Sequence, residues 1–378
     1  VEINPATGFV APDAVRAFAE KVASTQAAEG VWFLAGGSHN SVVIEMKDHG
    51  LLGYCCGGGG VVSNQRAAPL RHAGWPRRRL REGAGPGRPG HPGVAARPSP
   101  CGTVRAMCLV GVALGMSRRY PLVVASNRDE YLDRPSQALD WWSPWPDGPQ
   151  VLSGRDLRAG GTWMGVSQPG RFALVTNVRQ PFAAEPDAPS RGQIPLGWLR
   201  GDLPADRFWP RTALSGHAPF NLLAADFPAG EFFWTSNQHP HPQRLTRGIH
   251  GLSNAALDTP WPKVGRIKQR LSEALGQDLP LELLCATLFE ALADTTPAAD
   301  AELPQTGVGP AVERMLSPVF IRSPDGRYGT RCSTLLICEA RGRGLTTHMV
   351  ERQHHPAEER AFHLETWPPT GLPLVRRR

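Results

Sequence analysis

Residues 107–378 of this 378-residue chain are predicted to fold as an α+β domain, and three patterns in the sequence predict it. Short apolar runs open the region at 109–125, and similar runs close it at 333–351. Between them, residues 263–292 space their apolar side chains as one face of a helix does. Strands at both ends and helices in the middle indicate an α+β fold rather than alternating βαβ units.

The first predicted strands form two hairpins. Leu109–Leu114 and Tyr120–Ala125 are apolar and are joined by a short polar turn. Residues 162–166 and 171–176 flank Gln168-Pro169-Gly170, which contains the residue types that favour a tight reversal. We therefore expect two antiparallel pairs in the first third of the domain.

Two helices and a last strand pair complete the predicted domain. Lys263–Leu275 and Leu281–Leu292 have helical periodicity. Ser333–Cys338 and Leu345–Glu351 are expected to pair across the glycine-containing turn at 341–344.

The first 49 residues predict an unrelated, truncated α/β fragment. Asp13–Ala28 has the pattern of an amphipathic helix, and residues 30–48 that of two strands around a turn. This stretch is similar to the opening strands of metallo-β-lactamase-fold hydrolases. The His-x-His-x-Asp-His metal motif of that family does not occur in the sequence, so His39 is expected to be a turn residue and the fragment to be inactive.

Residues 50–106 predict a disordered linker. Positions 50–105 contain 13 Gly, 7 Pro and 9 Arg, without helix or strand periodicity. Such a composition buries too little apolar surface to offset the entropy of ordering. It is also what GC-rich DNA encodes when translated out of frame. We therefore expect a gene-model fusion, in which residues 1–106 are not part of the domain at 107–378.

The net charge of +7 does not indicate a nucleic-acid-binding protein. Residues 50–105 hold nine Arg and one acid, a charge of +8, so the rest of the chain sums to about −1. No basic and aromatic residues interleave elsewhere, and no apolar run is long enough to span a membrane. The seven cysteines form no Cys-x-x-Cys pair and no signal pattern opens the chain, so we expect a cytoplasmic location.

Met107-Cys108 leads directly into the first predicted strand. If Met107 were removed as an initiator methionine, Cys108 would be the first residue of its chain. Its α-amine, with an unperturbed pKa of about 8, could then take the proton of its own thiol. The alternative is a small apolar residue at the start of a buried strand.

Asn127-Arg128-Asp129-Glu130 ends the second predicted strand, beside Cys108 if the two strands pair. Alternation sends Asn127 and Asp129 to one face and Arg128 and Glu130 to the other. A carboxylate here could hold a terminal ammonium, and Asn127 could donate to an oxyanion. The alternative is a polar turn with an internal Arg–acid pair.

Four further residues are candidates at the ends of predicted strands. Asn177 and Asn254 carry neutral amides that could stabilise an oxyanion without titrating. Arg331 precedes the last apolar strand and could bind a substrate carboxylate or fix the nucleophile's surroundings. Trp163 follows the pair Gly160-Gly161 and could line a substrate site, although a core position is the alternative.

Together these short motifs resemble one family. In order, they are Met107-Cys108-Leu109, residues 120–131, Arg134-Pro135, residues 154–157, Gly160-Gly161-Thr162-Trp163, residues 176–179, Ser190-Arg191-Gly192, residues 220–223, residues 251–255, Pro260-Trp261-Pro262-Lys263, Leu303-Pro304-x-Thr306-Gly307 and residues 328–334. Their order and content resemble the NRDE family, also called the transport and Golgi organisation protein 2 family. The resemblance covers 107–378.

The resemblance implies a four-layer αββα sandwich of the N-terminal-nucleophile hydrolase type. The resemblance extends to the cysteine amidases of that fold. It implies catalytic roles in this chain for Cys108, Asp129, Asn177, Asn254 and Arg331. Substrate contacts are expected from Asn127, Arg128 and Trp163. One departure is that Ser126 stands where those amidases carry an arginine three residues before the aspartate.

Two functions follow as expectations. The first is a cysteine amidohydrolase acting on a small amide or acyl compound, with no metal or cofactor required. The second is a non-enzymatic cytosolic protein that binds or traffics haem or a lipid, since the family is known for haem and lipid handling.

Overall fold

The computed structural model describes residues 107–180, 188–239, 241–342 and 344–365, and the backbone of four short strands between 24 and 56. The chain divides into two compact units, Val1–Gly102 and Thr103–Arg378, and each is described by itself. His39, which was predicted to be a turn residue, lies outside the described residues, as do positions 57–106, which make up most of the predicted linker.

The first unit contains a four-stranded antiparallel sheet in the order β1-β2-β3-β4. β2 (Val31–Ala35) and β3 (Asn40–Glu45) are the two strands predicted in 30–48. Two predictions need correction. The end of the expected helix is strand β1 (Ser24–Ala28), and β4 (Leu51–Cys56) lies in the expected linker. Both pair along a neighbouring strand, and this backbone pairing outweighs the local sequence preference.

The second unit contains two larger sheets, and all of their strand pairs are antiparallel. The six-stranded sheet has the order β14 (Gly248–Leu252), β5 (Met107–Leu114), β6 (Leu122–Tyr131), β15 (Tyr328–Arg341), β16 (Gly344–His354) and β17 (Ala357–Glu365). The seven-stranded sheet has the order β13 (Gln243–Arg244), β12 (Glu231–Ser236), β11 (Phe220–Asp226), β10 (Arg171–Asn177), β9 (Met164–Ser167), β8 (Val151–Asp156) and β7 (Ser136–Trp142).

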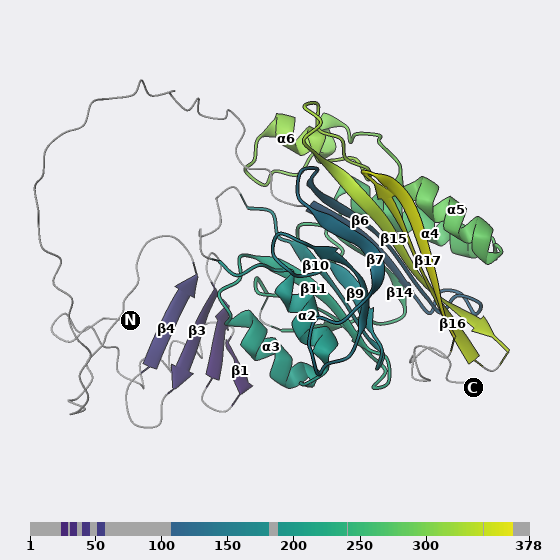
Figure 1. Ribbon diagram of the computed structural model, residues 1–378. Helices are drawn as coiled ribbons and strands as arrows, with labels where there is room; N and C mark the ends of the chain where they lie inside the picture. Colours follow the sequence, from purple (N-terminus) through teal and green to yellow (C-terminus); the bar gives the residue numbers. More distant parts are fainter. Residues whose placement is uncertain are drawn as a thin grey trace, which may run out of the picture. The chain divides into compact units, whose positions relative to one another are not determined.

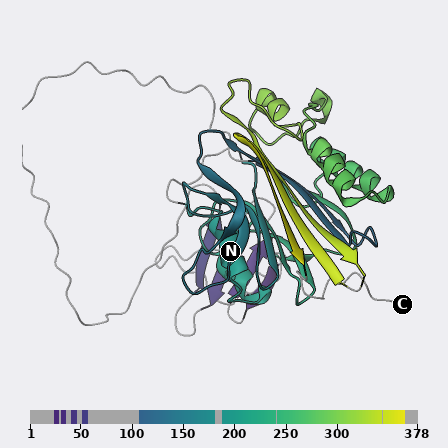
Figure 2. The same cartoon turned by 45° about the vertical axis from the view of Figure 1, so that its right-hand side comes forward.

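Helices cover the outer face of each sheet (Figure 1). The outer face of the six-stranded sheet packs against α4 (Pro262–Gly276) and α5 (Leu281–Leu292), the two helices predicted from the sequence. The outer face of the seven-stranded sheet packs against α2 (Gln193–Arg200) and α3 (Ala205–Ala213). Figure 2 shows α4 and α5 on one side of the yellow strands and the teal strands on the other. A short 3₁₀ helix (Asp300–Glu302) and α6 (Pro310–Met315) lie between α5 and β15.

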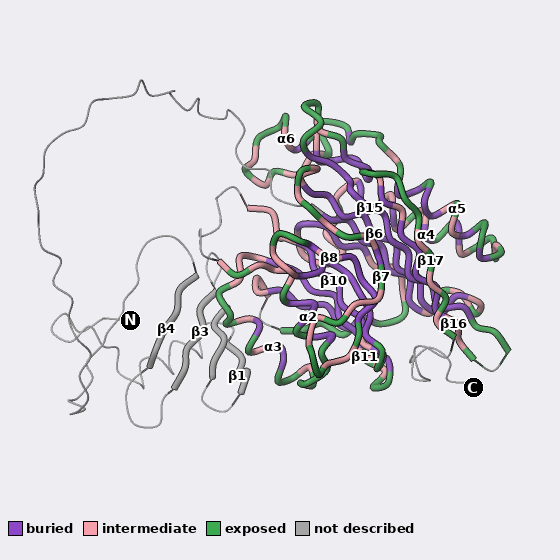
Figure 3. Tube along the Cα trace, viewed as in Figure 1, coloured by how far each residue is buried: buried purple, intermediate pink, exposed green. Residues whose placement is uncertain are grey.

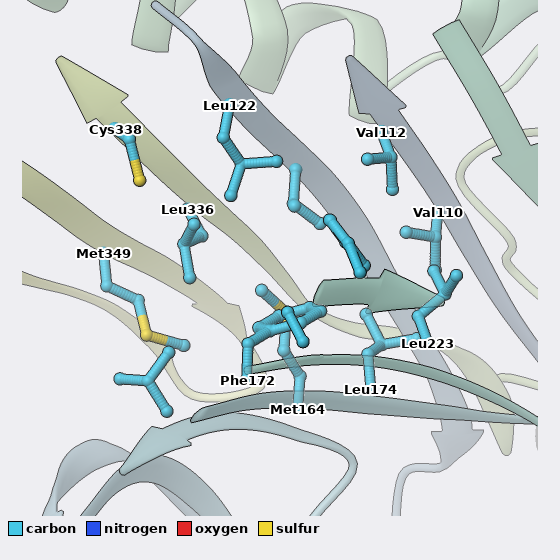
Figure 4. Close-up of a cluster of buried hydrophobic side chains, with 14 of the residues drawn as sticks. Val110, Val112, Leu122, Met164, Phe172, Leu174, Leu223, Leu336, Cys338 and Met349 are labelled. Carbon is cyan, nitrogen blue, oxygen red and sulfur yellow. The ribbon is translucent and has the colours of Figure 1, made fainter. Parts of the chain in front are cut away.

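The main core lies between the two sheets, where buried residues line both sets of strands (Figure 3). In Figure 4, Val110 and Leu336 of the six-stranded sheet point toward Phe172 and Leu223 of the seven-stranded sheet. With one core between the sheets and one beneath each pair of helices, the domain has four layers. The predicted αββα sandwich is therefore confirmed.

The side chains of β5 point alternately to the two faces of the sheet, so this one strand contributes to two cores. Val110 and Val112 lie in the core between the sheets, while Leu109 and Ala113 lie in the core beneath α4 and α5. Gly111 lets α4 approach closely, because a Cβ there would lie 2.5 Å from Leu271 Cδ1. Both faces of the strand are therefore buried, and its first residues carry this alternation into the candidate site.

Candidate active site

The candidate site lies where β5 begins and β6 ends. In the register of these strands, Cys108 is directly opposite Arg128, and Met107 is opposite Asp129. On the other side of β6, Arg128 is opposite Cys332, and Asp129 is opposite Thr330. The hairpin expected from the sequence therefore brings Cys108 and the 127–130 motif together.

The two faces of the sheet separate the predicted residues. Cys108 shares the face of Val110, toward the other sheet, and Arg128 lies on that face with its guanidinium 4.2 Å from the ring centroid of Trp163. Asn127 and Asp129 lie on the opposite face, toward α4 and α5. The thiol and the carboxylate predicted to cooperate are therefore near each other but on opposite faces.

Asp129 is fully buried and only partly satisfied. Its Oδ1 accepts a 2.6 Å hydrogen bond from Thr330 Oγ1, whereas Oδ2 has no hydrogen-bond partner among the described residues. Burial raises the pKa of this carboxyl group to about 6, against the lowering effect of the Lys263 ammonium and the Thr330 hydrogen bond. A buried carboxylate with an unused oxygen can receive a cation or a proton.

Lys263 is the main functional candidate that the sequence analysis missed. It lies in the first turn of α4, is 2% exposed, and its Nζ has no hydrogen-bond partner within the described part of the chain. Burial lowers the pKa of its amine to about 8, and the nearby Asp129 carboxylate partly opposes this shift. Such a buried amine is uncommon unless another charge compensates it.

A second buried pair completes what we call the charge cluster, which consists of Asp129, Lys263, Arg179 and Glu313. Arg179 and Glu313 form a direct ion pair, and the Glu313 carboxylate also accepts hydrogen bonds from the backbone N–H and hydroxyl of Thr306 at 2.9 and 2.5 Å. The Arg179 guanidinium stacks over Trp261, 4.5 Å from the ring centroid. With all four groups ionised, the cluster is neutral. Arg179 and Glu313 are hydrogen-bonded to each other, whereas Lys263 Nζ makes no hydrogen bond to Asp129 or to any other described residue.

The composition of the sequence could have pointed to Lys263 as a functional candidate. Only four of the 41 basic residues of the chain are lysines, and Lys263 directly follows a Pro-Trp-Pro sequence at the start of a predicted helix. Arg179 and Thr306 also lie in motifs noted above. Nothing local in the sequence shows that these motifs meet beneath Asp129, because that depends on how α4 and α6 pack.

Arg128 lies close to Cys108 and stacks on Trp163. Its side chain is buried, its Nη2 lies 3.8 Å from Glu130 Oε2, and its Nη1 has no hydrogen-bond partner among the described residues. Gly154 makes room for this arrangement, since a Cβ there would lie 2.3 Å from two atoms of the Trp163 ring. The unused donor therefore belongs to a rigid, cationic side chain beside the thiol.

Asn177 and Asn254 are brought together at the end of β10. Asn254 Nδ2 donates a 2.8 Å hydrogen bond to the carbonyl oxygen of Asn177, which leaves one of its N–H groups for another acceptor. Ser253 Oγ lies 3.0 Å from the carbonyl oxygen of Cys108 and 3.1 Å from Asn254 Oδ1. These bonds connect both asparagines to the backbone of the candidate nucleophile.

Asn127 and Arg331 serve the scaffold instead. Asn127 Nδ2 donates to the carbonyl oxygens of Leu292 and Val319, at 2.8 and 2.9 Å, so neither N–H is free for an oxyanion or a substrate. Arg331 lies at a β-bulge, and its Nη1 donates to the carbonyls of Tyr131, Leu132 and Arg134 at 3.2, 2.6 and 2.8 Å. These bonds give both side chains a structural role. Arg331 Nε has no hydrogen-bond partner among the described residues, and the predicted catalytic role of Arg331 and substrate contact of Asn127 stay predictions.

The Cys108 thiol is not activated in the uninterrupted chain. It is 8% exposed, and burial, with the Asp129 carboxylate as the next cause, raises its pKa to about 12. Only the thiolate is a strong nucleophile, so at neutral pH this thiol is almost entirely in its unreactive form.

A family profile described as Transport and Golgi organisation 2 matches residues 107–356, a span that holds every candidate residue named above. The chain belongs to the Transport and Golgi organisation 2 family. Among its curated relatives, the human Transport and Golgi organization protein 2 homolog is 34% identical over 265 residues, which are 65% of this chain and 91% of that protein. The mouse homolog is 33% identical over 239 residues, 59% of this chain and 84% of that protein.

Solved structures similar to this Transport and Golgi organisation 2 family member include an acylase and a hydrolase. Penicillin V acylase from Agrobacterium tumefaciens is 12% identical, with a TM-score of 0.37, and the match covers 69% of this chain and 87% of that one. A mutant of conjugated bile acid hydrolase from Clostridium perfringens is 9% identical, with a TM-score of 0.37, over 68% of this chain and 92% of that one.

The described residues contain neither a metal cluster nor a membrane-spanning helix. No group of three or more His, Cys, Asp or Glu side chains in them is arranged to hold a metal ion. None of the helices they form is long and apolar enough to cross a membrane.

Proposed function

We propose that residues 107–378 act as a cytoplasmic cysteine amidohydrolase on a small amide or acyl compound, with Cys108 as the first residue of its chain. The register of β5 against β6 carries this proposal. Met107 is opposite Asp129, so the peptide bond before Cys108 begins next to a residue whose buried carboxylate has an Oδ2 without a partner among the described residues. An N–H of a terminal α-amine at this place could donate to Oδ2 and would supply the missing partner.

Cleavage before Cys108 would also activate the thiol. A terminal amine replaces a neutral peptide group by a base that can take the thiol proton, and the ammonium formed in this way places a positive charge beside the thiolate. A nearby positive charge lowers the pKa of a cysteine, here from about 12. The proposal therefore accounts for an otherwise inert thiol.

The reaction has two balanced stages. In the first, the α-amine takes the Cys108 proton, the thiolate attacks the amide carbon, and the C–N bond breaks as the leaving amine takes that proton from the ammonium. In the second, the α-amine removes a proton from water, the resulting hydroxide attacks the thioester, and the thiol leaves with the proton. One amide and one water give one carboxylic acid and one amine.

The remaining residues have supporting roles in this proposal. The second N–H of Asn254 Nδ2, which is not used in the bond to Asn177 within the described residues, would stabilise the oxyanion together with Asn177, and Asp129 would hold the terminal amine. Arg128, with its unused Nη1, and Trp163 lie on the face of the thiol and would contact the substrate.

One experiment compares the same folded molecule before and after cleavage. The recognition sequence of a site-specific protease replaces the residues ending at Met107 in the full chain, so that cutting leaves Cys108 at a terminus. An electrophilic acyl probe is added before and after cutting, and peptide mass spectrometry gives the labelling rate of each cysteine. We expect cutting to accelerate labelling of Cys108 at least about tenfold and to leave Cys285, Cys332 and Cys338 unchanged.

The control is Cys108→Ala, which should lose only the fast label. If Cys108 reacts no faster than the other cysteines after complete cutting, the proposed mechanism is wrong. Mass spectrometry of the protein isolated from its own cells adds a second test, since the mechanism requires a chain that begins at Cys108.

Haem or lipid carriage stays as the alternative function, with haem as a ligand rather than a required cofactor. The family assignment motivates it, and no specific contact in the described residues favours it over hydrolysis. Titration of haem into micromolar protein tests it, because binding shifts the Soret band and a carrier should saturate at one haem per chain.

A further inference from the structure

The proposed mechanism does not use Lys263, a member of the charge cluster whose Nζ has no hydrogen-bond partner among the described residues. Its ammonium is buried in the first turn of α4, on the same side of the six-stranded sheet as Asp129. A Cβ at Gly251 would lie 2.6 Å from Val264 Cγ1, and Gly251 pairs with Gly111, so this turn of α4 packs against β14 and β5. Cys108 and Asp129 are both near enough to Lys263 for their charges to act on its amine.

We infer that Lys263 is a positioning residue that keeps the α-amine of a terminal Cys108 in its neutral, proton-accepting form at neutral pH. This inference rests on the proposed function. Lys263 acts through charge alone, since its Nζ makes no hydrogen bond to any described residue, the thiol included.

The electrostatic argument starts from Asp129. With this carboxylate alone beside it, the α-amine would be held as an ammonium, because a nearby opposite charge favours the charged form. An ammonium cannot take the thiol proton. A second cation near the same carboxylate opposes that effect, because two like charges disfavour each other. The Lys263 ammonium would therefore leave Asp129 ionised and the α-amine neutral.

The other charges around Lys263 do not replace it. Arg179, in the segment after β10, disfavours the charged form of Lys263, and Glu313 of α6 favours it. Arg179 and Glu313 are directly paired with each other, so their effects on Lys263 oppose each other. From β5, Cys108 carries no charge while its thiol is protonated. Within the described residues, the neighbours on β6 beyond Asp129 are Arg128 and Glu130, whose charges oppose each other. Lys263 is thus the cation directed at Asp129 that no direct ion pair cancels.

The first test uses the intact full chain and does not depend on catalysis. The protein has only four lysines, so labelling them with ¹³C gives few signals, and the one lost in Lys263→Arg identifies Lys263. We expect that signal to titrate near pH 8. Titration at the usual value of about 10.5 would mean that the pKa of this amine is not lowered, whereas the inference requires a lowered pKa.

The second test measures labelling of Cys108 against pH after cutting before Cys108. In Lys263→Met, the lower limb of the profile should move up by at least about one pH unit, a roughly tenfold loss of rate at pH 6.5. Lys263→Arg keeps the charge and should restore most of the rate at that pH. Lys268→Met is the matched control, because it removes a partly exposed lysine of the same helix that pairs with Asp258. It should leave the profile in place.

The outcomes separate the two ideas. If the cut wild-type protein does not label at Cys108, the proposed function fails, and the lysine titration still reports on the charge cluster. If it labels and Lys263→Met has the wild-type profile, the inference about Lys263 is overturned and the function stands. Should Lys263→Met not fold, Lys263→Gln serves in the same comparison, with near-ultraviolet circular dichroism as the check on folding.

Discussion

Cys108 and Asp129 are separated by one register step on neighbouring strands and lie on opposite faces of the sheet, because Cys108 pairs with Arg128 and Asp129 with Met107. Asp129 therefore lies beside the backbone at the start of β5, and the charge of its carboxylate also contributes to the raised pKa of the Cys108 thiol. This placement separates the residues into a thiol side, with Arg128 and Trp163, and a charge side, with Lys263.

Removing one member of the Asp129–Lys263 pair should destabilise the domain strongly. Asp129→Asn leaves a buried ammonium without its compensating charge, and Lys263→Met leaves a buried carboxylate, so each should lower the free energy of unfolding by about 3 kcal/mol. The double variant removes both charges and should lose much less than the sum of the single losses. Urea unfolding at pH 7 measures all three. Additive losses would show that the two charges do not interact.

The same pair should give the stability an unusual pH dependence. The raised pKa of Asp129 means that its contribution is present below about pH 4 and is lost as pH rises to about 6. The lowered pKa of Lys263 means that its contribution is present above about pH 10.5 and is lost as pH falls to about 8. Relative to the Asp129→Asn, Lys263→Met double variant, the wild type should therefore be least stable between about pH 6 and 8.

Urea unfolding across pH 4 to 10 checks this, with a slope of about 1.4 kcal/mol per pH unit expected on each side of the minimum. If the unfolding free energy of the wild type relative to the double variant rises from pH 4 to 6, burial is not the dominant influence on the pKa of Asp129.

Arg331→Met should lower stability without altering the chemistry at Cys108. The substitution removes three hydrogen bonds from a guanidinium to the carbonyls of the 131–134 turn, a loss of about 3 kcal/mol or more. The melting temperature should fall, while the labelling rate of folded, cut protein stays within about twofold of wild type. Arg207→Met, at an exposed position, is the control for loss of an arginine. A selective loss of labelling with unchanged melting would return Arg331 to the substrate site.

Arg128→Lys should weaken binding of the acyl probe more than it slows the reaction. Lysine keeps the positive charge but not the planar group that stacks on Trp163. We expect the probe concentration for half-maximal labelling to rise about tenfold, corresponding to about 1.4 kcal/mol, with a smaller change in the limiting rate. The opposite pattern would assign Arg128 to the chemical step rather than to binding.

Several helices and strands were not predicted from the sequence, and the structure shows why. Helices α2 and α3 are short and contain Pro195 and Pro210, so their local sequence does not favour a helix, and packing against the seven-stranded sheet stabilises them. β17 has a largely polar, exposed sequence and exists through its pairing with β16. In contrast, α4 and α5 carry a clear apolar periodicity, and their ends agree with the prediction to within one residue.

The sequence by itself determined that Cys108 meets Arg128 and Asp129. The two strands are adjacent in the chain and joined by a short turn, so their register follows from local turn geometry and alternation. Only the tertiary structure decided that Lys263 lies near Asp129, that Asn127 binds carbonyls at 292 and 319, and that Arg331 holds the 131–134 turn. These contacts join segments far apart in the chain. Their partners are set by how helices and loops pack over the sheet, which the pattern of a short segment does not encode.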